Sequence, residues 1–173
     1  MIGEGRESKK DNDLFYTCSL IDYIARKTKN TRADIVNDLG KKSLENIYDL
    51  ADVYHCDNID SVSEEFIGKC NIQEGKFDNV GECKYAIPTY WDIGKVYKRL
   101  IKKVSESEGV PVIDALIKVY NSFISEKSMI ITVVYTTKIR HIYMNLIRKI
   151  KYFNKKWMSF KKINGGKTNV RKT

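Results

Sequence analysis

The sequence predicts an all-α fold, a single bundle of about six amphipathic helices followed by a basic C-terminal tail. Between residues 14 and 124, apolar residues recur at spacings of three and four, which is the period of a helix with one buried face. Only two of the 173 residues are Pro and 42% are apolar, as expected for a folded globular domain. Short links join most of the periodic segments, so the helices are expected to pack around one core.

The first 40 residues predict a leader and two helices. Residues 1–12 have no apolar periodicity and are expected to be disordered. A second helix begins at Thr31, which approximates a capping box with Asp34, and it ends at Gly40 in a left-handed cap. The first helix covers residues 14–27, and its apolar stripe consists of Leu14, Phe15, Cys18, Ile21, Ile24 and Ala25.

Two more helices and a long loop follow. A third helix is predicted over residues 42–55. A fourth begins at residue 60 or 61 and ends at residue 70, with Ser61 and Glu64 in a capping-box relation. Residues 71–89 predict a loop with a short strand near residues 85–87.

The last two helices of the bundle have the clearest pattern. Trp91 opens a fifth helix, whose apolar positions are Ile93, Val96, Tyr97, Leu100, Ile101 and Val104. Its opposite side carries the residues that we name the basic stripe, namely Lys95, Lys98, Arg99, Lys102 and Lys103. A sixth helix begins after Pro111, and its apolar positions are Ile113, Leu116, Ile117, Tyr120 and either Phe123 or Ile124.

The charge distribution changes abruptly after residue 127. All 22 acidic residues and 19 of the 31 basic residues lie before this point, whereas the last 46 residues carry twelve Lys or Arg and no acid. The net charge of +9 therefore combines about −3 for the body with +12 for the tail. We divide the chain into a disordered leader (1–12), a helical domain (13–127) and a basic tail (128–173).

One segment has the spacing of a helix-turn-helix. Residues 31–40, followed by a helix from Ser43, have the required length and turn glycine. However, the second helix displays Glu45, Asp49 and Asp52, where a DNA-reading helix carries basic or amide side chains. Because phosphates would repel these acids, we interpret the pair as an ordinary helical hairpin.

Neither a metal site nor a catalytic site is predicted, and no cofactor is expected. The four cysteines, Cys18, Cys56, Cys70 and Cys83, lack the close pairs of a structural zinc site and are expected to be free thiols in a reducing cytoplasm. His55 precedes Cys56, but consecutive side chains on a helix point about 100° apart and do not form a dyad. A pocket that joined His55 to two convergent carboxylates would favour an enzyme.

Two functional hypotheses stay open, and an enzyme is the third. The first is a non-enzymatic cytoplasmic module that binds another protein through Tyr90, Trp91 and Tyr97, unless Trp91 and Tyr97 belong to the core. The alternative is a nucleic-acid-associated regulator, or a component of a toxin–antitoxin or defence locus, that uses the basic stripe and the tail. Neither a secretory signal nor a membrane span is expected. The oligomeric state is left open.

Four segments carry a family resemblance, namely residues 14–21, 48–55, 88–101 and 119–125. Through them, residues 14 to about 127 resemble a small uncharacterised family of Firmicutes proteins. Because the function of the family is unknown, the resemblance implies none here. In the family, the segment matching residues 120–125 continues into an acidic ending rich in Tyr and Asn, unlike the tail of this chain.

The tail has the properties of a frameshifted translation. Reading the codons of residues 129–153 from their third base permits an open frame that restores acidic residues. Two of these acidic residues follow from the genetic code whichever synonymous codons the gene uses. In the shifted frame, Met129 and the Ile after it give an Asp codon, and Met144 and the Asn after it give a Glu codon. Loss of one base within the A-rich codons of Glu126 and Lys127 would change the reading frame at this point.

Sequencing the gene across codons 120–135 tests this hypothesis. We expect one base to be missing relative to the frame that encodes the acidic ending. An intact and uniformly used frame in close relatives would contradict it.

Overall fold

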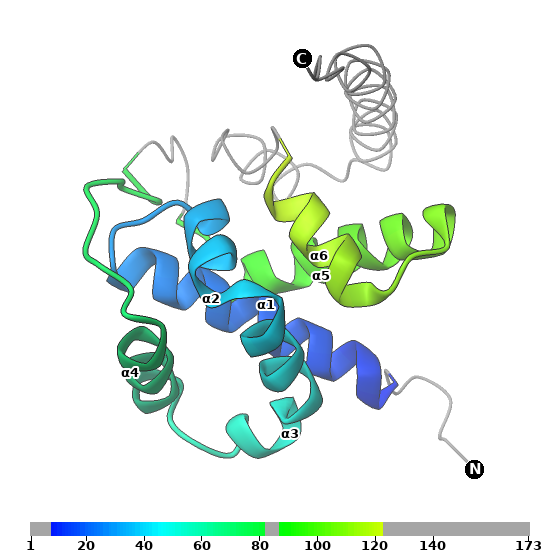
Figure 1. Cartoon of the computed structure of the whole chain (residues 1–173), viewed down its shortest axis with the longest axis horizontal. Helices are drawn as coiled ribbons and strands as arrows, with labels where there is room; N and C mark the ends of the chain where they lie inside the picture. The colour runs from blue at the N-terminus through cyan, green and yellow to red at the C-terminus, as the bar shows by residue number, and fades with distance from the viewer. Residues whose placement is uncertain (1–7, 82–86, 123–173) are drawn as a thin grey trace, which may run out of the picture. The chain divides into compact units, whose positions relative to one another are not determined.

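The computed structural model describes residues 8–81 and 87–122, which belong to the first of two units, Met1–Thr137. Over these residues the fold is all-α, as predicted (Figure 1). The helices are α1 (Lys9–Lys27), α2 (Arg32–Asp49), α3 (Ala51–Tyr54), α4 (Ile59–Cys70), α5 (Tyr90–Glu108) and α6 (Val112–Tyr120). Within the described ranges, no helix combines the length and the apolar character needed to cross a membrane. The basic tail lies outside these ranges.

The first helix begins earlier than the sequence predicts. Ser8 is its N-cap and accepts a hydrogen bond from the backbone N–H of Asp11 (3.2 Å). The Asp11 carboxylate also pairs with Lys102 on α5 (2.6 Å), which ties the first turn to the bundle. The prediction of a disordered leader is therefore wrong for residues 9–12, and residues 1–7 lie outside the described part of the chain.

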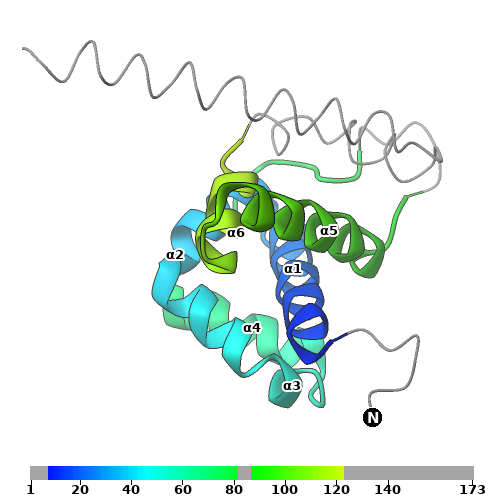
Figure 2. The ribbon, with the colours of Figure 1, turned by 90° about the vertical axis from the view of Figure 1, so that its right-hand side faces the viewer.

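α1 is the central helix of the bundle. It packs against α2, α3, α4 and α5, and Figures 1 and 2 show α5 on one side of it and α3 and α4 on the other. α6 packs on α5 and α2, and the rings of Tyr97 and Tyr120 stack there with their centroids 4.1 Å apart. Because neighbouring helices surround α1, its buried polar side chains need partners inside the bundle.

Asp22 on α1 shows how such a charge is satisfied. Its side chain is completely buried and accepts a hydrogen bond from Arg26 Nε (2.7 Å). It also accepts one from Nε of Arg32, a buried residue at the start of α2. Removing one member of such a buried ion pair leaves the other charge uncompensated, which costs about 3–5 kcal/mol. This ion pair therefore holds the first turn of α2 against α1.

The second and third helices differ from the prediction in where the chain breaks. Thr31 and Asp34 form the predicted capping box, and Gly40 interrupts α2 with a positive φ of 67°. The helix predicted to run to residue 55 instead ends before Leu50, whose side chain is 42% exposed. Ala51 is buried and starts α3, so the break redirects the chain and lets α3 pack against α1.

α4 begins earlier than predicted because a different residue caps it. The side chain of Asn58 accepts a hydrogen bond from the backbone N–H of Asp60 (2.9 Å), so the capping box predicted at Ser61 and Glu64 is wrong. The described loop residues after α4 are not helical, as predicted. Of the predicted strand, Ile87 is not in a strand and the other two residues lie outside the described ranges.

α5 begins at Tyr90 behind a capping box of Thr89 and Asp92. Val96 is half-buried, and the other predicted apolar positions lie in the core, namely Ile93, Tyr97, Leu100, Ile101 and Val104.

Gly94 lets α5 approach α1 closely. A Cβ atom added at Gly94 would clash with Ser19 Oγ and would lie 3.1 Å from the backbone oxygen of Phe15, both on α1. Ser19 Oγ donates a hydrogen bond to that same oxygen (2.8 Å), so it is not free to turn away. Any larger residue would have to push the two helices apart.

We predict that Gly94→Ala lowers the free energy of unfolding by roughly 2 kcal/mol, because overpacking at a helix contact forces backbone shifts. Gly68→Ala on α4 is the matched control, since a Cβ there meets nothing within 4 Å. The control should raise stability by about 0.5–1 kcal/mol, the usual gain for Ala over Gly in a helix. Urea denaturation followed by circular dichroism measures the free energy of unfolding of both variants. An equal increase in the two variants would contradict the close approach of α5 to α1.

Candidate functional site

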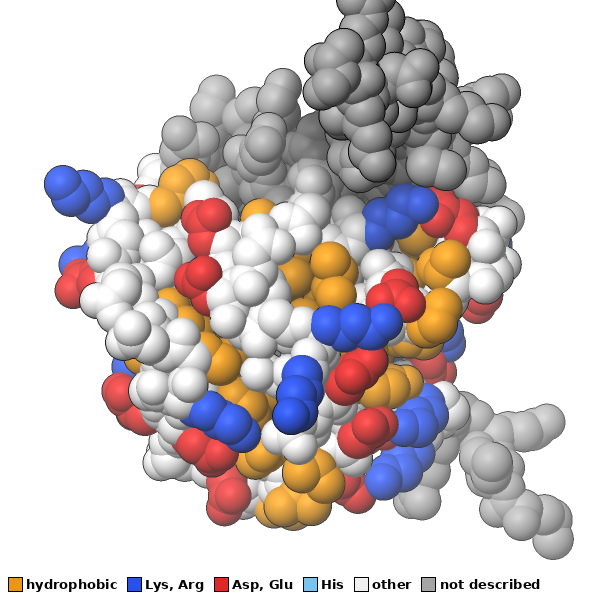
Figure 3. Space-filling model, viewed as in Figure 1, with side chains coloured by type: hydrophobic (Ala, Val, Ile, Leu, Met, Phe, Trp, Pro, Cys, Tyr) orange, Lys and Arg blue, Asp and Glu red, His pale blue; other side chains and the backbone are white. Residues whose placement is uncertain are grey.

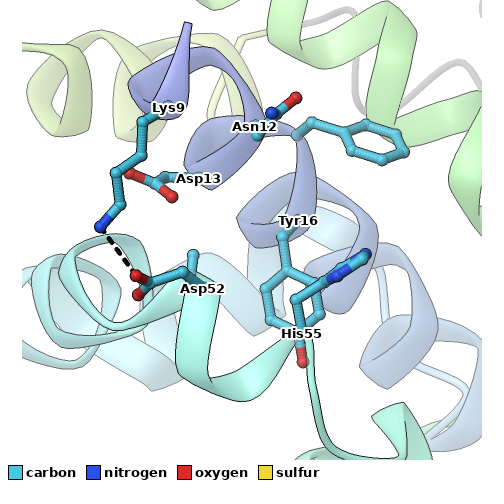
Figure 4. Close-up of a pocket in the computed structure, with 8 residues that line it drawn as sticks. Lys9, Asn12, Asp13, Tyr16, Asp52 and His55 are labelled. Atoms are coloured by element: carbon cyan, nitrogen blue, oxygen red, sulfur yellow. Dashed lines mark hydrogen bonds and ion pairs between the residues drawn. The ribbon is translucent and has the colours of Figure 1, made fainter. Parts of the chain in front are cut away.

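A cleft of about 570 Å³ lies between α1 and α3 (Figure 4). We name it the α1–α3 cleft. Its lining residues are Lys9, Asn12, Asp13, Phe15, Tyr16, Ala51, Asp52 and His55.

The helical period of α1 places the lining residues on one face. Lys9, Asp13 and Tyr16 are separated by four and three residues, which brings their side chains into one row. Asp52 and His55 are separated by three residues and face this row from α3 and its C-terminal cap. Figure 4 shows the charged side chains at one end of the cleft and the rings of Tyr16 and His55 at the other.

An exposed ion pair bridges the cleft. Lys9 Nζ donates a hydrogen bond to Asp52 Oδ2 (2.8 Å), and the two side chains are 64% and 53% exposed. This hydrogen bond lowers the pKa of Asp52 and raises that of Lys9. Exposed ion pairs of this kind contribute little to stability, so the bridge is easily opened.

Asp13 is the one lining carboxylate that is buried. Its side chain lies inside the bundle (3% exposed), and its Oδ2 atom has no hydrogen-bond partner. Burial raises the pKa of Asp13, because the charged form loses its hydration, and the nearby Lys9 and Lys10 only partly offset this. Asp13 is therefore an acceptor without a donor at the wall of a cleft.

A group of aromatic rings adjoins the cleft, and we name it the aromatic row. The His55 ring meets Tyr16 edge-on, with centroids 5.5 Å apart, and Trp91 at 5.9 Å. Trp91 also contacts Phe15 (5.4 Å) and Tyr90 (4.8 Å). Tyr16 is buried, His55 is exposed, and the other three residues are half-buried. The row thus presents ring surface to solvent beside the cleft.

The structure separates the three residues predicted as a contact surface. Tyr90 and Trp91 lie in the aromatic row and are half-buried. Tyr97 is 1% exposed and stacks on Tyr120, so it belongs to the core. The reason is its position on the same apolar face of α5 as Leu100 and Ile101.

The structure also shows that the residues of the basic stripe do not form one exposed basic surface. Lys98 is 5% exposed, with its Nζ 5.8 Å from the centre of the Phe15 ring, so it is not a surface residue. Lys102 pairs with Asp11. Lys95 lies 3.9 Å from Asp92 and Lys103 lies 3.9 Å from Glu106, while Arg99 is exposed.

The sequence pattern does not bring Lys9, Asp13 and Asp52 together as a group. Lys9 lies in the expected leader, and Asp52 stands out as an acid that opposes DNA binding and as a neighbour of His55. The spacing of Lys9, Asp13 and Tyr16, read behind Ser8 as an N-cap, is the signal that would have found the α1 wall.

The cysteines behave as separate thiols where they are described. Cys18 is buried, which raises its pKa to about 12, while Cys56 is exposed and Cys70 is partly buried. Cys83 lies outside the described residues. No group of three metal-ligating side chains occurs among residues 8–81 and 87–122.

The cleft does combine His55 with two carboxylates, the arrangement that would favour an enzyme. However, none of the hydrogen bonds within the described residues joins His55 to Asp13 or Asp52. Asp52 is held by Lys9 instead. His55 therefore lacks the hydrogen bond to a carboxylate that would orient it as a catalytic acid or base.

Comparisons with protein family models, with curated proteins and with solved structures give no match to this chain. The resemblance to a Firmicutes family therefore stays a prediction.

We predict that Asp13→Asn raises the free energy of unfolding at pH 7 by roughly 1 kcal/mol, because it removes a buried charge without a partner. Since the pKa of Asp13 is raised on folding, the folded state holds the proton more tightly, and wild-type stability falls as pH rises through this pKa. The gain should therefore vanish below about pH 4, near the ordinary pKa of Asp.

Urea denaturation between pH 3 and pH 7 measures this difference. Asp52→Asn is the control of opposite sign, because Lys9 lowers the pKa of Asp52 and so favours the folded state at neutral pH. A loss of stability in Asp13→Asn at pH 7 would show that the Asp13 carboxylate stabilises the fold.

Proposed function

We propose that this chain is a non-enzymatic helical module that binds another protein, and that its contact surface is the α1–α3 cleft with the adjoining aromatic row. The observation that carries this proposal is the half-buried ring surface of Phe15, Trp91 and Tyr90 beside a cleft. Aromatic residues are enriched at protein interfaces, where they anchor binding in pockets.

The described surface gives the nucleic-acid alternative little support. Nucleic-acid binding needs basic side chains that are free to neutralise several phosphates. In the basic stripe, Lys98 is buried and Lys102 pairs with Asp11. Figure 3 shows basic and acidic side chains intermingled over the face that it displays. The nucleic-acid hypothesis would thus depend on the tail, which lies outside the described residues.

A cytoplasmic location is part of the same proposal. The three described cysteines are free thiols, which is the state expected in a reducing compartment.

Site-specific photo-crosslinking in cells that express the full chain tests the proposed function. Asn12 and His55 line the cleft and are exposed, so a benzoyl-phenylalanine at either position should crosslink to the same partner protein. Lys42 on α2 and Glu65 on α4 are exposed control positions away from the cleft. They should not give this crosslink, and crosslinks to nucleic acid from the cleft positions would contradict the proposal.

A further inference from the structure

The unpartnered oxygen of Asp13 indicates what kind of ligand the α1–α3 cleft accepts. Asp13 is 3% exposed and its Oδ2 atom lacks a donor, so this oxygen has lost its hydration without gaining a hydrogen bond. A ligand that brought an N–H group to this oxygen would supply the missing bond. Hydrogen bonds to a charged acceptor are about twice as strong as those between neutral groups.

The charges around the cleft indicate that this donor is cationic. The lining carries two carboxylates, Asp13 and Asp52, against one ammonium group, Lys9. Lys10 and Asp49, which also act electrostatically on Asp13, offset each other, since they are paired at 3.4 Å. The formal charges of Asp13, Asp52 and Lys9 thus sum to −1, which one further positive charge would balance.

The walls of the cleft match a planar cation. Figure 4 shows the carboxylates of Asp13 and Asp52 at one end and the rings of Tyr16 and His55 at the other. A guanidinium group is planar, donates up to five hydrogen bonds and stacks on aromatic faces, so its chemistry suits both the carboxylate end and the ring end of the cleft. An ammonium group has the charge but lacks the plane.

Lys9 occupies part of this position in the free protein. It precedes Asp13 by one helical turn, and its side chain passes Asp13 on the way to Asp52 (Figure 4). Because it is 64% exposed and held by one surface ion pair, a better donor can displace it at low cost. Lys9 then acts as an internal competitor for the carboxylates.

We propose that the α1–α3 cleft binds an arginine side chain of the partner protein, with Asp13 and Asp52 accepting its N–H groups and Lys9 displaced. This inference rests on the proposed function, because it names the group by which the partner is recognised. It assigns a binding role to a carboxylate that the fold itself leaves without a partner.

Titration of the full chain with N-acetyl-arginine amide tests the inference. The Trp91 indole N–H resonance is the readout, because its ring lies 5.9 Å from that of His55, and a Trp157→Phe variant assigns it. We expect saturable binding with a dissociation constant of roughly 1 mM, or about −4 kcal/mol. N-acetyl-citrulline amide has the same shape without the charge and should bind at least tenfold more weakly, as should N-acetyl-lysine amide.

Two variants of cleft residues should change the affinity for the arginine probe in opposite directions. Asp13→Asn should weaken binding at least tenfold, while Lys9→Gln should strengthen it several-fold. The Lys41–Asp114 ion pair (2.6 Å) joins α2 to α6 away from the cleft, so Lys41→Gln and Asp114→Asn are matched controls that should change nothing. Thermal melting of each variant excludes loss of fold as the cause.

Equal affinities for the arginine and citrulline probes, or for Asp13→Asn and wild type, would overturn the inference. So would weaker binding by Lys9→Gln, because Lys9 would then be part of the site. If the crosslinks from Asn12 and His55 persist while the arginine probe fails, only this inference is lost. If the probe binds but no protein crosslinks, the proposed function is lost instead.

Discussion

The close contact of α5 with α1 at Gly94 determines where the aromatic surface lies. Because no Cβ separates the helices there, Gly94 sits against Ser19 and the backbone of Phe15. Trp91 on α5 and Phe15 on α1 each lie within one turn of this contact, and their rings meet with their centroids 5.4 Å apart. That contact places Trp91 beside His55, which comes from α3. The aromatic row and the cleft therefore depend on a helix contact one turn away rather than on the site residues alone.

Two aspartates on α1 show the difference between a charge that stabilises the fold and one that is available for binding. Asp22 is completely buried, but Arg26 and Arg32 satisfy both of its oxygens. Asp13 is nearly as buried, and Oδ2 has no partner. Folding alone gains nothing from a buried carboxylate without a donor, since a neutral residue of similar size would cost less. Because Asp13 lines a cleft, the proposed binding role accounts for a carboxylate that folding alone does not require.

Local sequence patterns predicted the helices, because apolar spacing and capping residues act within a few positions of each other. The box at Thr31 and the apolar face of α5 were predicted from such patterns, whereas the box at Thr89 was not. The errors arose where several local signals competed or where a residue serves a distant partner. Asn58 precedes Ser61 and caps α4 first. Lys98 lies over the Phe15 ring of another helix, which helical spacing along α5 does not indicate. The cleft could not be predicted, because Asp13 and Asp52 come to line the same cleft only after the chain breaks at Leu50 and turns α3 onto α1.

The charge of the whole chain is a poor guide to this site. The net charge of +9 comes from the tail, since residues 1–127 carry about −3. At physiological ionic strength, charges in solvent are largely screened beyond about 8 Å. A cation that enters the cleft therefore interacts mainly with Asp13, Asp52 and Lys9, whose sum is negative. Because burial of Asp13 also weakens screening of its charge, the local sum governs binding more strongly than the total does. A basic protein can thus present an acidic site, and the site has to be identified from the residues that line it.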